Sequence, residues 1–431
     1  MLSTNRLLTV WLKDNLVNIY DLCIFLPLVY WCIFKNERNS IVVKSLFSLM
    51  LGLISCNVFA YNELVTKKEF FMPEYQTYNN QKINDVRVGW EAYGELNKNK
   101  DNVILITHYF GGNSHAAGKY RTTDSTKGYW DSIIGSGKAI DTDKYYVVSV
   151  DSLVNMEVHN PNVITTGPAT INPQTGKPYG LDFPVVTIRD FVNVQKAVLD
   201  SLGIKKLHAV IGASMGGLQA YEWASTYPEM VERVIPVISS GYVSGNLVAW
   251  LNIWASPIKL DPNWNGGDYY DSIAPTDGLA AAFKTVALHG QSWEWANESF
   301  GRSWADTDKN PADAYANQFK IESVLDAAGL SRAKVSDANH FLYLAKACQL
   351  FYAGHGKSIV NGLAQIKAPA LLIHSEEDQI FIPEQVRKTA NIMEAFGTSV
   401  RVYEIQGTHG HFDGVMSIAQ ASNAIKQFLD K

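Results

Sequence analysis

The fold is decided by one stretch of the chain, Leu207-His208-Ala209-Val210-Ile211-Gly212-Ala213-Ser214-Met215-Gly216-Gly217. Its apolar first half predicts a short buried strand, and the segment that follows it, Gln219–Thr226, predicts a helix. Between them lies the pattern G-x-S-x-G, in which a serine on a tight strand-to-helix turn projects its hydroxyl above the carboxyl end of a parallel sheet. The glycines suit such a turn because bulky neighbours would clash there. Ser214 is therefore the candidate nucleophile, and the alternative is a Gly/Ser turn that serves packing alone.

Strands and helices alternate on both sides of this motif from residue 84 on, a pattern typical of a parallel sheet covered by helices. The predicted strands are Val86–Tyr93, Asn102–His108, Tyr145–Asp151, Leu207–Ile211, Val231–Ile238, Ala368–Ser375 and Val400–Ile405. The predicted helices are Thr187–Leu202, Gln219–Thr226, Val386–Phe396 and Met416–Leu429. Together with the serine turn, the alternation predicts an α/β-hydrolase fold, with a mostly parallel sheet and helices on both faces.

The pattern changes between Gly241 and about Ile366, where Trp, Ala and Asn are frequent and no strand-like run occurs. Helical stretches are expected at Leu279–Leu288 and Ala338–Phe351. We interpret residues 241–366 as a helical lid inserted over the sheet. The hydrolase core then comprises residues 61–240 and 367–431.

A serine hydroxyl is a weak nucleophile unless a histidine takes its proton and a carboxylate orients that histidine. In this fold class the acid follows the serine in the chain and comes after a late strand. Asp378 lies just after the predicted strand Ala368–Ser375 and is the candidate acid. Its neighbours Glu376 and Glu377 are alternatives, and any of the three is otherwise a solvated loop carboxylate.

The histidine is expected after the next strand, where Gly407-Thr408-His409-Gly410-His411 offers two candidates. We expect His411 to be the base and keep His409 as its rival. The pair also suggests metal ligands, but no third ligand pattern accompanies it and H-E-x-x-H is absent from the sequence. The sequence therefore predicts no metal and no cofactor.

The negative charge that develops on the substrate oxygen needs two preorganised N–H donors. The backbone N–H of Met215 is the first, since it directly follows the nucleophile. The second is expected in the loop after an early strand, Thr107-His108-Tyr109-Phe110-Gly111-Gly112, where Phe110 is the candidate donor. In this loop region His108 and His115 are expected to be structural hydrogen bonders.

Composition excludes several other classes of protein. The 431 residues are 47% hydrophobic and 18% charged, which is ordinary for a globular domain. The net charge is −5 and no basic cluster stands out, which argues against nucleic acid as a partner. The expected partner is a small acyl substrate, because the candidate nucleophile Ser214 predicts acyl chemistry. Three of the four cysteines lie in the first 60 residues, so Cys348 stands alone in the folded part and is expected to be a buried apolar residue.

The first sixty residues contain two apolar stretches. Leu22–Phe34 is short for a transmembrane helix, although a membrane anchor is the competing interpretation. The second stretch has Lys44, the apolar run Leu46–Ile54 and the small-residue site Val58-Phe59-Ala60, which together describe a signal peptide of about residues 42–60. We infer a start at Val42 or Val43, with residues 1–41 a mis-assigned extension, and a periplasmic or secreted protein. Cys56 in Leu53-Ile54-Ser55-Cys56 leaves a lipid-anchored form as the alternative.

Many spaced motifs between about Val88 and Val415 resemble those of the homoserine O-acetyltransferase family of α/β-hydrolase-fold enzymes. They are Trp130–Asp141, Thr166-Gly167-Pro168, Ile171-Asn172-Pro173, Gly176–Gly180, Phe183–Asp190, Gly212–Gly217, Asp261–Tyr269 and Asp337-Ala338-Asn339. The resemblance places Ser214, Asp378 and His411 on the family's triad and residues 241–366 on its helical lid. It also implies a homodimer joined through that lid.

Two positions depart from the family pattern. The resemblance implies an acceptor-binding arginine a few residues after a Gly-Leu pair, but counting from Gly278-Leu279 reaches Phe283. It also implies an aspartate directly after the catalytic histidine, where this chain has Phe412, with Asp413 shifted by one. Three hypotheses follow: an exported hydrolase of esters or related acyl compounds, an O-acyltransferase with an acyl-CoA donor, and a non-catalytic binding protein on the same scaffold.

The signal-peptide hypothesis predicts a mature protein that begins at Tyr61 and is free of the membrane. N-terminal sequencing of the exported protein after expression from the full gene measures this directly. A lipid-modified Cys56 at the new N-terminus would show the anchored form instead.

Overall fold

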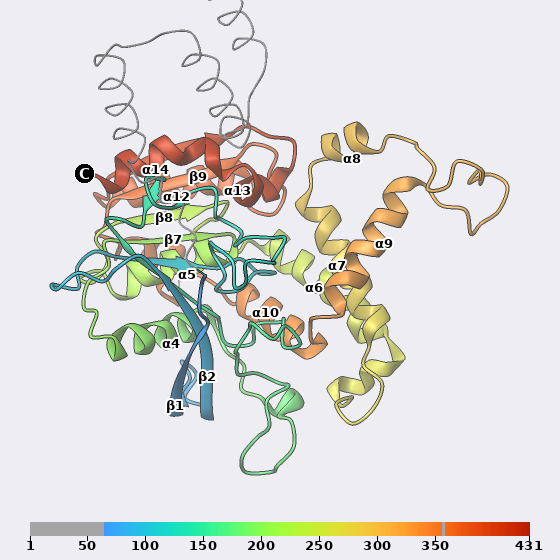
Figure 1. The fold of residues 1–431 in the computed structure, drawn as a ribbon, viewed down its shortest axis with the longest axis horizontal. Coiled ribbons are helices and arrows are strands. Elements are labelled where there is room, and N and C mark those ends of the chain that lie inside the picture. The colour runs from blue at the N-terminus through green and yellow to red at the C-terminus, as the bar shows by residue number, and fades with distance from the viewer. Residues whose placement is uncertain (1–63, 356–357) are drawn as a thin grey trace, which may run out of the picture. The chain divides into compact units, whose positions relative to one another are not determined.

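An eight-stranded sheet with helices packed around it organises the described residues (Figure 1), with strand order β1-β2-β6-β3-β7-β8-β9-β10. The computed structural model describes residues 64–355 and 358–431. From β6 to β10 neighbouring strands are parallel, while β1, β2 and β6 pair in antiparallel fashion. The strands are β1 Lys68–Gln76, β2 Lys82–Tyr93, β3 Val103–Thr107, β6 Tyr146–Val150, β7 Ala209–Ala213, β8 Val234–Val237, β9 Ala370–Ser375 and β10 Val400–Ile405, with a small separate pair, β4 Ile134–Gly135 and β5 Ile140–Asp141. The predicted fold class is confirmed.

The sheet separates two apolar cores because successive side chains of a strand point to opposite faces. In β3, Val103 and Leu105 join one core, whereas Ile104 and Ile106 join the other. The first core is closed by α4 Ile188–Ser201, α5 Met215–Thr226 and α12 Pro383–Ala395, and the second by α14 Ser422–Leu429. Strands covered on both faces read as continuous apolar runs, which is why the sequence revealed them clearly.

Helix α4 begins with a capping box that also ties down the edge of the sheet. The Asp190 carboxylate accepts hydrogen bonds from the backbone N–H and hydroxyl of Thr187, at 2.7 and 2.8 Å. Its other oxygen accepts from the Tyr75 hydroxyl of β1 at 2.7 Å and from the backbone N–H of Tyr78 at 2.6 Å. One buried carboxylate thus satisfies four donors and joins the edge hairpin to α4.

The described residues between β8 and β9 contain helices joined by turns and loops, and no strand of the sheet. The helices are α6 Gly245–Leu260, α7 Thr276–Gly290, α8 Trp293–Ser299, α9 Lys320–Ala333, α10 Ala338–Gln349 and α11 Ile359–Leu363. Helix α7 packs against both α6 and α9, and these helices lie together to one side of the sheet (Figure 1). We call residues 241–366 the lid. A homodimer formed through it remains a prediction.

Three elements illustrate how the structure differs from the sequence predictions. Strand β1 was not predicted, because its Pro73 and its many polar residues argue against a strand; the structure places it at the sheet edge, where proline is tolerated. Helix α5 begins at Met215, directly after the nucleophile, earlier than the predicted Gln219. The predicted single helix Met416–Leu429 is divided into a short helix, a 3₁₀ turn and α14.

The proposed signal peptide, Cys56 and the apolar stretch Leu22–Phe34 lie outside the described residues. Among the residues that the structure describes, no helix has the length and apolar character needed to cross a membrane.

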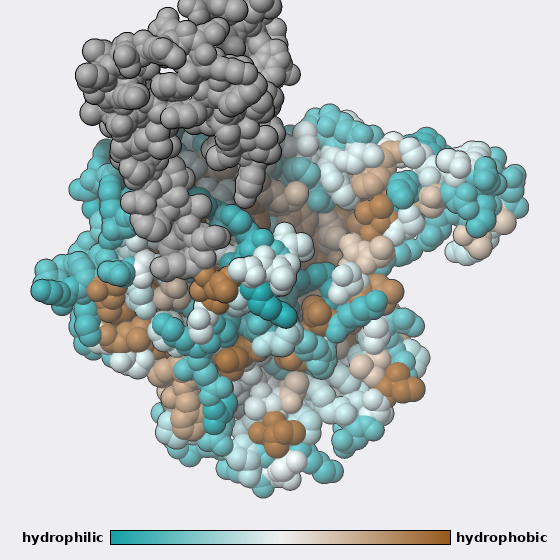
Figure 2. All heavy atoms as spheres, viewed as in Figure 1, coloured by the Kyte–Doolittle hydropathy of each residue, from teal (hydrophilic) through white to brown (hydrophobic). Residues whose placement is uncertain are grey.

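The face seen in Figure 2 is mainly hydrophilic, with apolar residues in small separate groups. Cys348 is buried, as expected.

Replacing Asp190 with Asn removes the charge that four donors share. We expect Asp190→Asn to lower the free energy of unfolding by about 1–3 kcal/mol, since an amide cannot accept all four hydrogen bonds. Chemical denaturation of purified proteins measures the change. The exposed carboxylate Asp182 provides the control, and an equal loss in Asp182→Asn would contradict the structural role of Asp190.

Candidate active site

The turn between β7 and α5 holds Ser214 in a strained backbone conformation, with φ 56° and ψ −118°. The turn packs so closely on β3 that a Cβ on Gly216 would lie 2.0 Å from the Thr107 carbonyl oxygen. The Thr107 hydroxyl in turn donates to the Gly216 carbonyl at 2.8 Å. The turn therefore requires glycine at this position for steric reasons, and it presents Ser214 at the carboxyl end of the sheet.

Ser214, His411 and Asp378 form one hydrogen-bonded chain of side chains. The distance from Ser214 Oγ to His411 Nε2 is 2.8 Å, and the distance from His411 Nδ1 to Asp378 Oδ2 is 2.9 Å. All three side chains are buried. This is the geometry in which a histidine takes the serine proton while the carboxylate fixes the ring's tautomer and orientation.

The loop after β9, which we call the acid loop, contains Glu376, Glu377 and Asp378, and its hydrogen bonds distinguish Asp378 from the two glutamates. Its Oδ1 accepts from the backbone N–H groups of Ile380 at 2.8 Å and Phe381 at 3.0 Å, so the other oxygen is aimed at the histidine. Glu376 instead faces outward and pairs with Arg387 at 2.9 Å. Of the three candidate carboxylates, Asp378 is therefore the one in contact with His411.

The rival histidine and the shifted aspartate both have structural partners. His409 Nδ1 lies 3.3 Å from the Gln291 side-chain oxygen. Asp413 is fully buried and accepts from the His409 backbone N–H at 3.2 Å and from the Ser417 hydroxyl at 2.7 Å. Asp413 thus shapes the loop that carries His411, and its carboxylate is already committed to hydrogen bonds with the protein, including one from the Ser375 hydroxyl of β9 at 3.4 Å.

The backbone N–H groups of the two candidate oxyanion donors, Phe110 and Met215, have no acceptor among the described residues. Phe110 and Ser214 line one cavity, and Met215 follows Ser214 directly. Free donors beside the nucleophile are what a developing oxyanion requires. Their catalytic role, like that of the triad residues, remains a prediction.

His108 and His115 hold in place the loop of residues 107–112 that carries Phe110, which we call the oxyanion loop. Ser152 donates its backbone N–H to His108 Nε2 at 3.0 Å, so His108 carries its proton on Nδ1, which lies 2.9 Å from the Tyr109 carbonyl oxygen. Burial lowers the pKa of His108 and keeps the ring neutral. His115 lies 3.0 Å from a carboxylate oxygen of Glu91. Both histidines are therefore structural hydrogen bonders in this fold, as expected.

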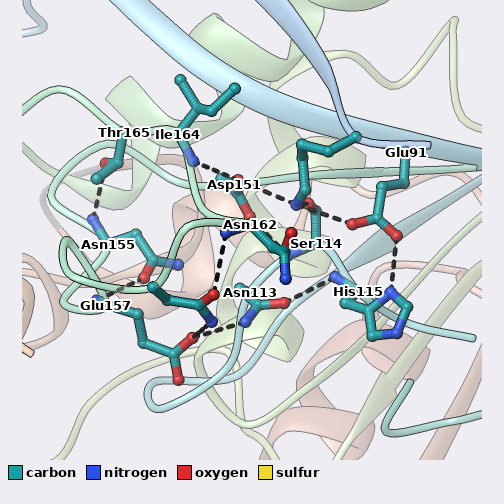
Figure 3. A network of polar contacts seen from close by, with 12 residues as sticks. Glu91, Asn113, Ser114, His115, Asp151, Asn155, Glu157, Asn162, Ile164 and Thr165 are labelled. Atoms are coloured by element: carbon teal, nitrogen blue, oxygen red, sulfur yellow. Dashed lines mark hydrogen bonds and ion pairs between the residues drawn. The ribbon is translucent and has the colours of Figure 1, made fainter. Parts of the chain in front are cut away.

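A buried polar network extends from this loop (Figure 3). The Asp151 carboxylate accepts from the backbone N–H groups of Ser114 at 2.7 Å and Ile164 at 3.1 Å. Lys67 lies 2.8 Å from Glu91 and 3.3 Å from Asp151. Burial alone would raise the pKa of Glu91, but the hydrogen bond with His115 and the charge of Lys67 lower it to about 2. Glu91 is therefore ionised at neutral pH and can keep its ion pair with Lys67.

The cavity beside Ser214 has a volume of about 260 Å³ and lies between the sheet and the lid. Its lid side includes Trp254 of α6 and Phe283, Val286 and Ala287 of α7. Both predicted pocket residues, Phe283 and Phe412, line it. The remaining lining residues contributed by the core are Tyr109, Gly111, Ile238, Ile380, His411 and Val415. Most of the wall is apolar.

Phe412 packs directly on the end of α7. A Cβ on Gly290 would lie 2.6 Å from the Phe412 ring, so the glycine leaves room for it. Lys284, the residue next to Phe283, forms an ion pair with Asp326 of α9 and is absent from the cavity wall. Lys284 therefore does not supply the charge that is missing at Phe283. Asp413, whose carboxylate is already hydrogen-bonded, does not supply the one that is missing at Phe412.

Sequence reasoning missed two residues near the site. Arg332 of α9 lines the cavity, and its guanidinium carbon lies 5.6 Å from the centre of the Phe283 ring. His289 is buried and stacks on Trp250 with ring centroids 4.0 Å apart. Burial lowers the pKa of His289 to about 4, and the proximity of His411 adds to the shift, so the ring is uncharged at neutral pH. No local motif marks either residue, since both reach the site through the packing of the lid.

One group of potential metal ligands occurs among the described residues, formed by His374, Glu376 and Glu404. Glu376 is already paired with Arg387, and the group contains no member of the triad. None of these three residues lines the cavity beside Ser214.

Comparison with known proteins now identifies the family. A family model described as alpha/beta hydrolase fold matches residues 146–413. The homoserine O-acetyltransferase of Methanohalobium evestigatum is 39% identical over 349 residues, which cover 81% of this chain and 70% of that protein. The homoserine O-acetyltransferase of Deferribacter desulfuricans is 38% identical over 367 residues, 85% of this chain and 95% of that protein. The chain belongs to the homoserine O-acetyltransferase family.

Solved structures agree with this assignment and add a second activity. The homoserine O-acetyltransferase of Bacillus anthracis matches with a TM-score of 0.82 and 36% identity over 86% of this chain and 98% of that one. An enzyme described as esterase E22 also matches with a TM-score of 0.82. The two chains are 49% identical, and the match covers 85% of this chain and 100% of the esterase chain. This family member is therefore an α/β-hydrolase-fold enzyme, and its chemistry is acyl transfer or hydrolysis.

The geometry predicts the outcome of three substitutions. Ser214→Ala is expected to abolish turnover, and His411→Ala to do nearly as much harm, because loss of a triad member costs about 10⁴–10⁶ in rate. His409→Ala is the control, expected to retain most activity because its ring contacts Gln291.

Steady-state kinetics on folded proteins, checked by circular dichroism, measure these effects. Full activity in Ser214→Ala would overturn the mechanism. A larger loss in His409→Ala than in His411→Ala would move the base to His409.

Proposed function

We propose that this family member hydrolyses carboxylic esters through an acyl-Ser214 intermediate, with water as the acceptor. The observation that carries the proposal is the pair Phe283 and Phe412 in the cavity wall. These rings occupy the positions at which the family resemblance implies an arginine and an aspartate. The 49% identity with an enzyme described as an esterase supports the same activity.

In the first half of the proposed reaction, His411 takes the hydroxyl proton as Ser214 Oγ attacks the ester carbonyl. Asp378 stabilises the resulting imidazolium, and the N–H groups of Phe110 and Met215 stabilise the negatively charged oxygen. The tetrahedral intermediate then collapses: its bond to the alkoxy oxygen breaks, and His411 returns the proton to the leaving alcohol.

In the second half, His411 removes a proton from water as its oxygen attacks the acyl carbon. The bond to Ser214 Oγ breaks, the serine regains its proton from His411, and the carboxylic acid leaves. The same intermediate would transfer its acyl group if an alcohol bound in place of water. The two activities therefore differ only in what the pocket holds beside the acyl-enzyme.

A zwitterionic acceptor suits this pocket poorly. A carboxylate that enters a partly desolvated site needs a charged partner, and arginine supplies the best matched one. Phe283 offers neither charge nor hydrogen-bond donor, and Phe412 cannot hold an ammonium group. Arg332 does line the cavity, but its charge is already paired with Glu157, and its guanidinium donates to Glu157 and to the Gly111 carbonyl, both at 2.6 Å. Neutral, largely apolar esters fit such a wall better.

The second candidate function is O-acyl transfer from an acyl-CoA donor, favoured by the 36% identity with the enzyme of Bacillus anthracis and by Arg332 in the cavity. The third, a non-catalytic binding protein, is disfavoured by the complete Ser214–His411–Asp378 hydrogen-bonded chain.

We also propose that the enzyme works in the periplasm or outside the cell, on the basis of residues 42–60. Acetyl-CoA is cytoplasmic, so export would favour water as the acceptor.

An ester panel, assayed with and without acetyl-CoA and homoserine on protein that starts at Tyr61, tests the proposal. We expect hydrolysis of short neutral esters, and homoserine transfer at least about 100-fold less efficient, the size of effect produced by a buried charge without its partner. If the enzyme acetylated homoserine with a kcat/KM typical of enzymes, the hydrolase proposal would be wrong.

Variants of Phe283 separate charge from shape. Phe283→Arg combined with Phe412→Asp supplies both missing charges and should raise homoserine transfer. Phe283→Leu, the matched control, removes the ring without adding a charge and should leave homoserine transfer at background.

A further inference from the structure

Arg332 links the lid to the loop that carries the candidate oxyanion donor. It lies in the last turn of α9, and its guanidinium forks between two acceptors. Nη1 donates to Glu157 Oε1 and Nη2 donates to the Gly111 carbonyl oxygen, both at 2.6 Å. The Glu157 side chain is 5% exposed, whereas that of Arg332 is 37% exposed. A charge-assisted pair of this geometry is stronger than a neutral hydrogen bond.

The same pair also holds the far end of the loop. Glu157 Oε2 accepts from the Asn113 side-chain amide at 2.7 Å, a contact visible in Figure 3, and from that of Asn160 at 2.9 Å. Between the two attachment points lies Gly112, whose carbonyl accepts from the Asn155 amide at 2.9 Å. Since Gly111 and Gly112 have no side chains to restrict them, the loop depends on these outside contacts for its conformation.

A relay of peptide groups leads from Arg332 to Phe110. Arg332 binds the Gly111 carbonyl, and the N–H of that same peptide unit, on Gly112, donates to the Tyr109 carbonyl at 2.9 Å. The Tyr109 carbonyl belongs to the peptide unit whose N–H is that of Phe110. In a trans peptide the C=O and N–H point in opposite directions, so fixing the Tyr109 carbonyl fixes the direction of the Phe110 N–H. Hydrogen bonds arranged in series strengthen one another.

We propose that the Arg332–Glu157 pair is a latch through which the closed lid positions the oxyanion donor. Arg332 and Glu157 are positioning residues: they act on the reaction through Gly111, Gly112 and Tyr109. On the core side, the loop is held independently by the hydrogen bond that His108 Nδ1 donates to the Tyr109 carbonyl oxygen. The latch adds the lid-side constraint, so the donor reaches its working geometry only when α9 lies against the loop. The proposal rests on the catalytic role of Ser214 proposed above.

A position in the cavity wall also allows a different role for Arg332. A guanidinium has five N–H groups, so donors remain beyond the two bonds that the protein takes. Those donors could bind a carboxylate on the substrate. The two roles predict different kinetics: a positioning role lowers kcat at nearly constant KM, whereas a substrate-binding role raises KM for acidic substrates alone.

Labelling of Ser214 by a fluorophosphonate measures the oxyanion site without any assumption about the acyl acceptor. Ser214 Oγ forms a bond to phosphorus, His411 takes the serine proton, and the P–F bond breaks to release fluoride. The phosphoryl oxygen then occupies the oxyanion position. The second-order labelling rate would be compared among wild type, Arg332→Met, Glu157→Gln and the double variant, alongside kcat and KM on a neutral ester.

We expect Arg332→Met to slow labelling and kcat about 10-fold or more, within the roughly 10²–10³ that loss of a whole oxyanion donor costs. Glu157 lies outside the cavity wall, so Glu157→Gln should slow the labelling rate and kcat less than Arg332→Met does. The double variant should be no slower than Arg332→Met. Arg332→Lys should recover part of the rate, since one ammonium cannot reach both acceptors as the fork does. Lys284→Met is the matched control, because it removes a lid cation that pairs with Asp326 and leaves the loop untouched.

Equal rates in Arg332→Met and Lys284→Met, with both proteins folded by thermal melting, would overturn the latch. So would unchanged kcat together with a raised KM confined to esters that carry a carboxylate. Failure of the wild type to hydrolyse any ester would remove the proposed function, but the labelling rates would still decide the latch.

Discussion

The structure depends on one close approach, in which the β7–α5 turn packs on the end of β3 with no room for a Cβ on Gly216. Ser214 is held there at φ 56°, a conformation that a non-glycine residue adopts at a cost. The surrounding sheet and helix α5 supply the packing that maintains it. Because this turn stands at the carboxyl end of the central strands, it determines where the acid, the base and the oxyanion loop must converge.

Each partner of Ser214 is positioned by its own local hydrogen bonds. The acid loop aims one Asp378 oxygen at His411 by occupying the other with two backbone N–H groups. Asp413 shapes the histidine loop. His108, held in one tautomer, fixes the oxyanion loop from the core side. Independent anchoring of this kind preorganises a site, so that little rearrangement is needed when charge develops on the substrate.

The pocket combines an apolar wall with one charge that the protein itself compensates. Phe283 and Phe412 occupy the positions at which the family resemblance implies charged side chains, and Gly290 makes room for the Phe412 ring. Arg332 enters from a different helix, lies over the Phe283 ring and is bonded to Glu157. The cavity therefore contains a cation without offering an unpaired charge. In this family member the lid contributes both the apolar surface and a polar contact to the oxyanion loop.

The sequence by itself determined the fold class, the nucleophile turn and the short lists of acids and bases, because these depend on local periodicity and on glycine at fixed spacing. It could not choose between Asp378 and its glutamate neighbours, or between His411 and His409, on geometric grounds. Adjacent residues in a loop have the same sequence signal, whereas their directions are set by contacts with distant segments. Strand β1 escaped prediction because an edge strand need not show an apolar pattern. Arg332 could be found only in the tertiary structure, since the lid packing brings it to Gly111, a residue more than two hundred positions away in the chain.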